Sequence, residues 1–324
     1  MSALPDSVRQ LAAGDFGVVA RRFAAAGRVV AQPARGILSV RGGGARPAVL
    51  VSVGVHGDET GPIEMLARVI DTLSLAPETL AADLMLCVGN VDAIAAGKRF
   101  IDADLNRMFR PQRGALADAA EAVRADQMIA ATADFFKDAG AGRWHLDLHT
   151  AIRPSVYPTF AIVPDLVAGK ARADLTGWLG EAAIGAIIMN PKSAGTYSYH
   201  SAEHHGAAGT TVELGRIGTL GQNDLSLFAD VEAALYRLLR GEAPVAARAE
   251  PHVFKVAQEI IKLSDDFFMR VGRGTHNFTA LPQGEVIATD GDTVYTVKHE
   301  EELVVFPNPD VRAGLRAGLM VVRV

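Results

Sequence analysis

The sequence predicts an α/β fold, in which helices sandwich a mixed, mostly parallel central sheet and a small C-terminal β domain follows. Short apolar runs alternate with amphipathic segments through the first 240 residues. Several runs are apolar at consecutive positions, which is typical of strands covered on both faces. From about residue 250 the segments become short, rich in Val, Ile and Phe, and separated by turn residues, as in a β domain.

The elements follow one another in a regular order. A predicted helix over residues 6–26 precedes two predicted strands, ARGILSVRG and PAVLVSVGV, which are β-branched and bounded by Gly and Pro. Further strands are predicted at LMLCVGN (84–90), WHLDLH (144–149), TFAIVP (159–164), AIGAIIM (183–189) and TTVEL (210–214). Helices are predicted at about 62–75, 115–138, 165–180 and 224–240, where apolar residues recur at intervals of three and four. In such a sheet, ligands bind beyond the carboxyl ends of the strands.

A stretch without periodicity, RGEAPVAARAEP, follows the last of these helices. Its Gly, Pro and Ala content is typical of a linker. We therefore predict one domain over residues 1–245, which carries every candidate site residue named below, and a small β-rich domain over residues 250–324. The role of the β domain and the formation of a homo-oligomer stay open at this point.

Charge and composition exclude several classes of function. The chain has 32 Lys and Arg against 37 Asp and Glu, with no basic run, which argues against nucleic-acid and anionic-membrane partners. No apolar stretch approaches the roughly 20 residues that span a bilayer. The amino terminus has Asp6 where a signal peptide requires basic and then apolar residues. The single cysteine, Cys87, cannot form an internal disulfide and fits a buried position in a reducing compartment, so we expect a cytoplasmic protein.

Candidate metal ligands lie at the ends of two predicted strands. His56 and Glu59 follow directly after PAVLVSVGV, and this spacing can aim an imidazole nitrogen and a carboxylate at one point about 2 Å from each. Catalytic zinc sites use three protein ligands, and His149 at the end of WHLDLH is the third candidate. Each residue alone has an ordinary explanation, such as a loop histidine or a helix N-terminal carboxylate. Their joint occurrence at strand ends favours one zinc ion per chain.

Two further carboxylates accompany these residues. Asp147 lies two positions before His149 and so shares its face of the strand, where it could accept a hydrogen bond from a ligating histidine, with His56 the expected partner. Its alternative is a surface ion pair. Glu213 in TTVELG lies in an apolar run, where an unpaired carboxylate is costly to bury. Beside a zinc-activated water it would act as general base and then as general acid; its alternative is an ion pair with Arg216.

The segment RFIDADLNRMF (99–109) carries two arginines and an asparagine between aromatic residues. Arg99 and Arg107 present planar groups that suit a carboxylate or a developing oxyanion, and Asn106 can hold another polar group of a ligand. Arginines of this kind are usually solvated. The metal candidates on either side of the segment favour a role in substrate binding.

Taken together, four motifs resemble the succinylglutamate desuccinylase and aspartoacylase family of zinc carboxypeptidase-like hydrolases. They are GVHGDETGP, NVDAIAAGKRFIDADLNRMF, DLHT, and VELG followed by GQNDLSLF. The resemblance spans about residues 36–240 and extends less distinctively into the C-terminal region. GQNDLSLF and the approach YSYHSAEHHGA look more like the succinylglutamate desuccinylase branch.

The resemblance implies an N-acyl amino acid as substrate and a role for each matching residue. The implied reaction is hydrolysis of the linear amide of N-succinyl-L-glutamate to succinate and L-glutamate, the last step of arginine degradation by the succinyltransferase route. Alternatives are an N-acyl-aspartate hydrolase with the same machinery and a non-catalytic binding paralogue, which would have no use for the catalytic carboxylate. The implied roles are zinc binding by His56, Glu59 and His149, catalysis by Glu213, polarisation of the scissile carbonyl by Arg99, and binding of a substrate carboxylate by Asn106 and Arg107.

One stretch departs from the family pattern. Aspartoacylases carry an arginine shortly before the VELG-like motif, whereas this chain has YSYHSAEHH over residues 197–205. Tyr199 and His200 are the candidates for polar contacts with the acyl end of the substrate, and a plain surface loop is the alternative. The preferred acyl group therefore stays open.

Overall fold

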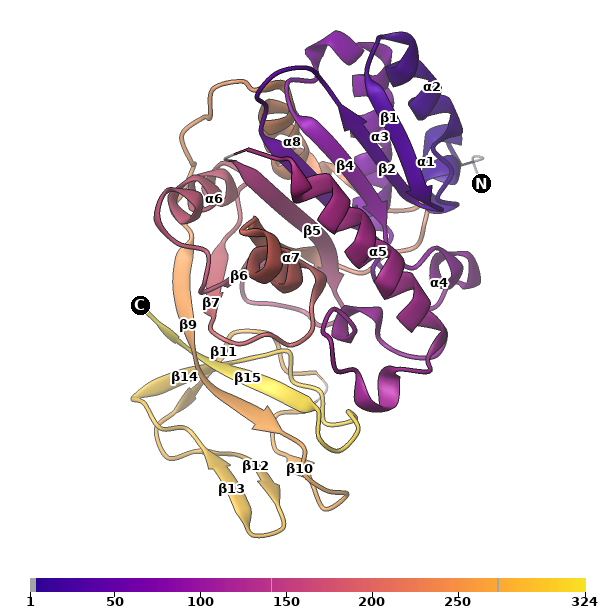
Figure 1. The fold of residues 1–324 in the computed structure, drawn as a ribbon. Helices are drawn as coiled ribbons and strands as arrows, with labels where there is room; N and C mark the ends of the chain where they lie inside the picture. The colour runs from indigo at the N-terminus through magenta and orange to yellow at the C-terminus, as the bar shows by residue number, and fades with distance from the viewer. Residues whose placement is uncertain (1–3, 141, 273) are drawn as a thin grey trace.

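The computed structural model describes residues 4–324 except residues 141 and 273. Its main sheet has twelve strands in the order β1-β2-β4-β3-β5-β8-β6-β7-β9-β15-β14-β11 (Figure 1). Pairing is parallel between β4, β3, β5 and β8 and again between β6, β7 and β9, whereas β6 and β8 are antiparallel. The predicted mixed sheet with a mostly parallel centre is confirmed.

The strands of the main sheet are β1 (Val29–Ala34), β2 (Ile37–Arg41), β3 (Ala48–Val53), β4 (Asp83–Val88), β5 (Arg143–Ala151), β6 (Thr159–Pro164), β7 (Ala186–Asn190), β8 (Ala208–Arg216), β9 (His252–Ile261), β11 (Thr279–Pro282), β14 (Glu301–Val305) and β15 (Arg316–Arg323). A second, three-stranded sheet consists of β10 (Phe268–Met269), β12 (Val286–Asp290) and β13 (Thr293–Thr296).

Helices cover both faces of the main sheet. The α-helices are α1 (Asp6–Ala12), α2 (Gly17–Ala25), α3 (Gly61–Leu75), α4 (Val91–Ala96), α5 (Ala120–Lys137), α6 (Gly169–Glu181), α7 (Tyr197–His205) and α8 (Ala229–Arg240). In Figure 1, α5 and α7 lie in front of the sheet, whereas α3 and α8 lie behind it. Among the described residues, no helix is long and apolar enough to cross a membrane.

The core occupies both faces of the central strands because their side chains alternate. In β3, Val49, Val51 and Val53 contribute to the core beneath α3 and α8, while Leu50 contributes to the core beneath α5. All four side chains are fully buried. Cys87 of β4 is a free, buried thiol on the α5 face. This two-sided burial explains the consecutive apolar residues in the sequence.

Two stretches differ from the sequence prediction. The single helix predicted over residues 6–26 is wrong, because the chain turns between α1 and α2 at Gly14, which has a φ of +65°. A Cβ there would lie 2.9 Å from the Cα of Gly36, so this close approach requires glycine. The second stretch, residues 197–205, forms the helix α7, and the alternative of a plain surface loop is wrong.

The C-terminal strands continue the main sheet. β9 pairs in parallel with β7 and antiparallel with β15, so the sheet runs without a break across the boundary predicted between residues 245 and 250. Residues 241–251 form neither helix nor strand, as expected of the linker. The division into two domains stays a prediction.

Candidate active site

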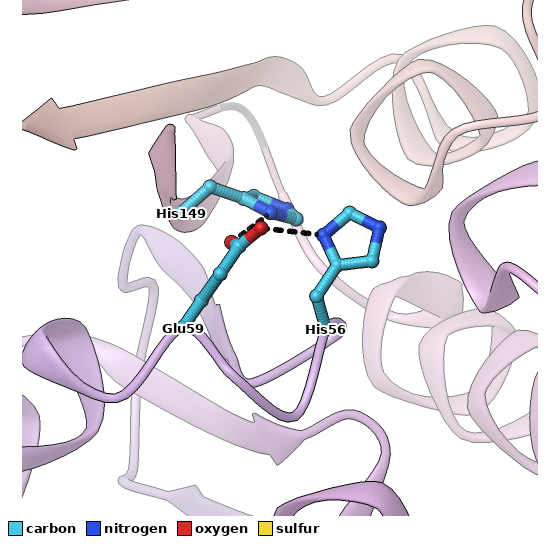
Figure 2. Close-up of side chains that lie close together, drawn as sticks. All are labelled: His56, Glu59 and His149. Atoms are coloured by element: carbon cyan, nitrogen blue, oxygen red, sulfur yellow. Dashed lines mark hydrogen bonds and ion pairs between the residues drawn. The ribbon is translucent and has the colours of Figure 1, made fainter. Parts of the chain in front are cut away.

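Three buried side chains converge at the carboxyl ends of β3 and β5. His56 and Glu59 lie in the turn from β3 to α3, and His149 lies near the end of β5. The Nδ1 atoms of His56 and His149 are each 2.8 Å from a carboxylate oxygen of Glu59, and one candidate ligand atom from each residue lies within 4.8 Å of the others. Figure 2 shows both imidazole rings directed at the Glu59 carboxylate. The structure therefore brings all three predicted ligands together.

Local packing holds the turn that carries His56. A Cβ at Gly57 would lie 2.4 Å from backbone atoms of Ala93 and Ile94, so only glycine allows the turn to pack this closely on α4. The Gly57 backbone N–H also donates to the carbonyl oxygen of Arg99, at 2.9 Å. The turn after β3 is therefore tied to the Arg99 segment by backbone as well as by side chains.

A carboxylate lies against the outer nitrogen of each histidine. Nε2 of His56 is 2.9 Å from Oδ1 of Asp104, and Nε2 of His149 is 2.9 Å from Oδ2 of Asp147. The expectation that Asp147 holds His56 is wrong. Asp147 contacts His149 because the two residues share one face of the same strand, and it also accepts a 2.5 Å hydrogen bond from the Ser52 hydroxyl.

This arrangement fits a metal ion. With a metal ion bound, each neutral ring would keep its proton on Nε2, against the carboxylate there, and direct its Nδ1 lone pair at the shared point. Without metal, burial favours the neutral form of Glu59, but the positive charge of the two histidines outweighs it and holds the pKa of Glu59 well below its usual value. Two imidazoles and one ionised carboxylate form a donor set that zinc commonly has in hydrolases.

Glu213 lies beside the histidines at the end of β8. The register of β5 and β8 pairs it with His149, and it is only 8% exposed. Among the described residues its Oε2 has no hydrogen-bond partner, and it forms no ion pair with Arg216. Burial and the charge of Glu59 raise the pKa of Glu213 to about 7, against the lowering effect of His149. A carboxyl with this pKa can both take up and release a proton near neutrality.

Arg99 lies directly against the candidate ligands. Its Nη1 is 2.9 Å from Oε1 of Glu59, and its Nη2 is 3.2 Å from Nε2 of His56. The guanidinium also lies 3.6 Å from Asp58. Its positive charge is therefore within reach of any group held at the three ligands.

Asn106 and Arg107 lie in a 3₁₀ turn, η2 (Leu105–Arg107). Asn106 is buried, and its side-chain oxygen accepts a 2.9 Å hydrogen bond from the backbone N–H of Tyr197 at the start of α7. Arg107 is 36% exposed, and its guanidinium lies 3.9 Å from Asp104 and donates to the Asn106 carbonyl. Asn106 thus ties the turn to α7, while Arg107 is the more accessible of the two.

Tyr199 and His200 lie on α7, and the structure does not join either of them to the ligand group by a described hydrogen bond. The Tyr199 hydroxyl donates to the carbonyl of Pro191, at 3.3 Å. His200 is 7% exposed, and neither ring nitrogen has a hydrogen-bond partner among the described residues. Burial, with the nearby His204, lowers the pKa of His200 to about 4. A role for either residue at the acyl end stays a prediction.

Comparison with known proteins decides the family. A family model described as the succinylglutamate desuccinylase/aspartoacylase catalytic domain matches residues 45–239, and one described as the AstE/AspA barrel-sandwich hybrid domain matches residues 249–324. The chain belongs to this family. The resemblance drawn from the four sequence motifs is confirmed.

Relatives within the desuccinylase/aspartoacylase family are similar over most of their length. Proteins named succinylglutamate desuccinylase from Burkholderia orbicola (strain MC0-3) and Burkholderia cenocepacia are 46% identical to this chain, over 86% of the chain and 82% of each relative. A crystal structure of succinylglutamate desuccinylase from Vibrio cholerae matches with a TM-score of 0.84 and 32% identity, over 91% of this chain and 90% of that one. The structure from Chromobacterium violaceum matches with a TM-score of 0.81 and 31% identity, over 95% and 97%.

Asp104 contacts the candidate ligand His56 but was not predicted from the sequence. Asp104 lies inside RFIDADLNRMF, but only the arginines and the asparagine of that segment stood out there. Its side chain accepts from the Asn106 backbone N–H at 2.9 Å while it contacts His56. The sequence signal was an acidic residue two positions before Asn106, the spacing of a turn cap.

Proposed function

We propose that this chain is a zinc-dependent succinylglutamate desuccinylase that binds one zinc ion per chain and hydrolyses N-succinyl-L-glutamate to succinate and L-glutamate. The observation that carries the proposal is the buried His56–Glu59–His149 group beside an unpaired Glu213 carboxylate oxygen, in a chain 46% identical to proteins of that name. The two histidines and Glu59 would hold the metal. Zinc bound there supplies Lewis-acid polarisation of the amide carbonyl and lowers the pKa of a water molecule.

The protein's own residues then divide the remaining work. Glu213 accepts the proton of the attacking water at its Oε2 atom and delivers it to the leaving amine nitrogen. Arg99 donates hydrogen bonds to the carbonyl oxygen as negative charge develops on it. The outer contacts of Asp104 and Asp147 keep the two histidine rings in one orientation.

Substrate recognition depends on local charge. N-succinylglutamate carries three carboxylates, whereas the chain has a net charge of −5, so attraction must come from arginines near the site. Arg107 would bind one substrate carboxylate through two parallel hydrogen bonds. Asn106 would support it by holding the turn η2 against α7 through the Tyr197 backbone.

A side-by-side assay of the zinc-loaded protein tests the proposal. Release of free amine is measured with N-succinyl-L-glutamate, N-acetyl-L-aspartate and N-succinyl-L-arginine, together with the zinc content of the same samples. We expect kcat/KM to favour N-succinylglutamate by about tenfold or more, since a site built for a charged group rejects analogues that leave it unpaired. Preference for N-acetylaspartate would identify an aspartoacylase, and zinc-loaded protein without activity on any of the three would identify a binding paralogue.

A further inference from the structure

Arg316, at the start of β15, has a guanidinium nitrogen that the fold leaves without a hydrogen bond. Its Nη1 is inaccessible to solvent and has no hydrogen-bond partner among the described residues. The ion pair that it makes, with Oε1 of Glu259 in β9, is 3.6 Å long, beyond hydrogen-bond range. Leaving a charged donor desolvated without an acceptor at hydrogen-bond distance costs free energy, which a further acceptor beside this guanidinium would recover.

A chain of contacts links Arg316 to the candidate active site. Glu259 also pairs with Lys192, at 3.3 Å, and Lys192 lies in the segment between β7 and α7. The same segment packs on the turn that carries Arg107, because a Cβ at Gly195 would lie 2.6 Å from the Arg107 carbonyl oxygen. The C-terminal strands β9 and β15 therefore meet the Arg107 turn across this segment.

Three positive charges at this junction face two carboxylates, those of Glu259 and of Asp104, which lies 3.9 Å from Arg107. Burial and the charge of Arg107 lower the pKa of Arg316 to about 10, although the neighbouring carboxylate of Glu259 raises it. Lys192 adds a third positive charge, and Glu259 is shared between Lys192 and Arg316. Like charges held together in this way are stabilised by an anion placed between them.

We propose that Arg107 and Arg316 together bind the two carboxylates of the glutamyl part of the substrate, with Arg316 on the γ-carboxylate. The inference rests on the proposed function. N-succinylglutamate has one carboxylate on the acyl side of the scissile amide and two on the glutamyl side. Two neighbouring arginines match the glutamyl side, which carries two carboxylates, because each planar guanidinium can bind one of them. The C-terminal β region would then contribute a specificity-determining residue to the active site.

The test pairs a protein change with a substrate change. Arg316→Met is compared with the wild type on N-succinyl-L-glutamate and on N-succinyl-L-glutamine, in which a neutral amide replaces the γ-carboxylate. We expect the substitution to raise KM for N-succinylglutamate by about tenfold or more with kcat largely kept, because the contact is made equally before and during reaction. The effect on N-succinylglutamine should be several-fold smaller, since the wild type already lacks the contact there.

Three further variants separate specificity from structure. Arg312→Met, an exposed arginine four residues away, should leave both substrates unaffected. Arg316→Lys should retain part of the discrimination, because a point charge replaces the planar group, and it serves as the test if Arg316→Met fails to fold. Glu259→Gln removes the ion pair but keeps Arg316, and it should preserve the preference for the γ-carboxylate.

Several outcomes would exclude Arg316 as the residue that binds the γ-carboxylate. Equal losses on both substrates, a loss confined to kcat, or full reproduction of the loss by Glu259→Gln would give Arg316 a structural role only. Unchanged kinetics would remove it from the site. Failure of the wild type to hydrolyse N-succinylglutamate would instead refute the proposed function, so the two failures are distinguishable.

Discussion

At the residue scale, the surroundings of Glu213 separate proton transfer from metal binding. Its carboxylate lies beside His149 in the β5–β8 register but does not belong to the group of three side chains whose ligand atoms meet. It is also the carboxyl at this site whose pKa is raised, whereas that of Glu59 is lowered. One environment thus produces an ionised ligand and a carboxyl able to exchange a proton.

Replacing Glu213 tests this separation directly. Glu213→Gln should retain zinc while kcat falls by about a hundredfold or more, because a positioned base is lost but no ligand is. Zinc content and kcat are measured on the same preparation. Near-normal turnover would exclude Glu213 as the base, and loss of zinc would make it a ligand.

Glu213 also gives the metal-free protein a pH dependence of stability. Its pKa rises from 4.5 to about 7 on folding, so between these values the folded state keeps a proton that the unfolded state has released. The carboxyl therefore destabilises the fold progressively as pH rises through this window, and Glu213→Gln abolishes that effect. After chelation of metal, we expect the Tm of Glu213→Gln to rise relative to that of the wild type as the pH is increased from about 5 to about 8. A constant Tm difference would contradict the raised pKa.

The two arginines of the RFIDADLNRMF segment should differ in kinetics. Arg99 lies against the ligand group, where its contact with the carbonyl oxygen strengthens only as charge develops, so Arg99→Ala should lower kcat more than it raises KM. Arg107 would hold a substrate carboxylate that is charged both before and during the reaction, so Arg107→Ala should mainly raise KM. Steady-state kinetics on N-succinylglutamate measures both. If both variants merely lowered kcat, this division of roles would be wrong.

At the element scale, the turn η2 does more than connect two segments. Asp104 caps it through the Asn106 backbone, and the same carboxylate reaches Nε2 of His56. Asn106 in turn accepts from the first backbone N–H of α7. The orientation of a candidate metal ligand therefore depends on the conformation of a short turn about fifty residues away in sequence, and that turn depends on α7.

Loss of the Asp104 carboxylate should weaken the metal site without removing a ligand. Asp104→Asn should reduce zinc affinity by about ten- to a hundredfold, the usual effect of losing a carboxylate behind a ligating histidine. Competition with a chelator measures the affinity. Asp102→Asn is the matched control, because Asp102 is exposed and its carboxylate accepts from the Ala120 backbone instead. Equal effects of the two changes would assign the loss to the segment as a whole.

At the scale of the whole molecule, the metal site joins neighbouring strands. His56 and Glu59 follow β3, and His149 lies near the end of β5, so a bound ion would cross-link the centre of the sheet. A ligand that binds only the folded state raises its stability in proportion to the logarithm of the free ligand concentration over Kd. Zinc should therefore stabilise the entire cooperative unit and not only the turn.

Metal removal checks this expectation. Chelation should lower the Tm of the wild type, and readdition of zinc should restore it. His56→Ala and His149→Ala should each lose zinc and activity together, and their Tm should no longer respond to zinc. Stoichiometric zinc in the His149→Ala protein would remove His149 from the ligand set.

The amino-acid sequence by itself determined the α/β class, the order of the central strands and helices along the chain, and the positions of the candidate ligands. These follow from local patterns: consecutive apolar residues predict strands buried on both faces, and His56, Glu59 and His149 stand where such strands end. Parallel neighbours bring their carboxyl ends together, so convergence of these residues could be expected before the structure.

Only the tertiary structure decided which side chains meet. It assigned Asp147 to His149 and Asp104 to His56, formed α7 from a histidine-rich stretch, and continued the main sheet through β9 into β15, which begins at Arg316. The physical reason is that these contacts join segments remote in sequence. They depend on strand register and on the conformation of turns such as η2, which hydrophobic periodicity does not encode, because periodicity reports which face of an element is buried and not what lies against it.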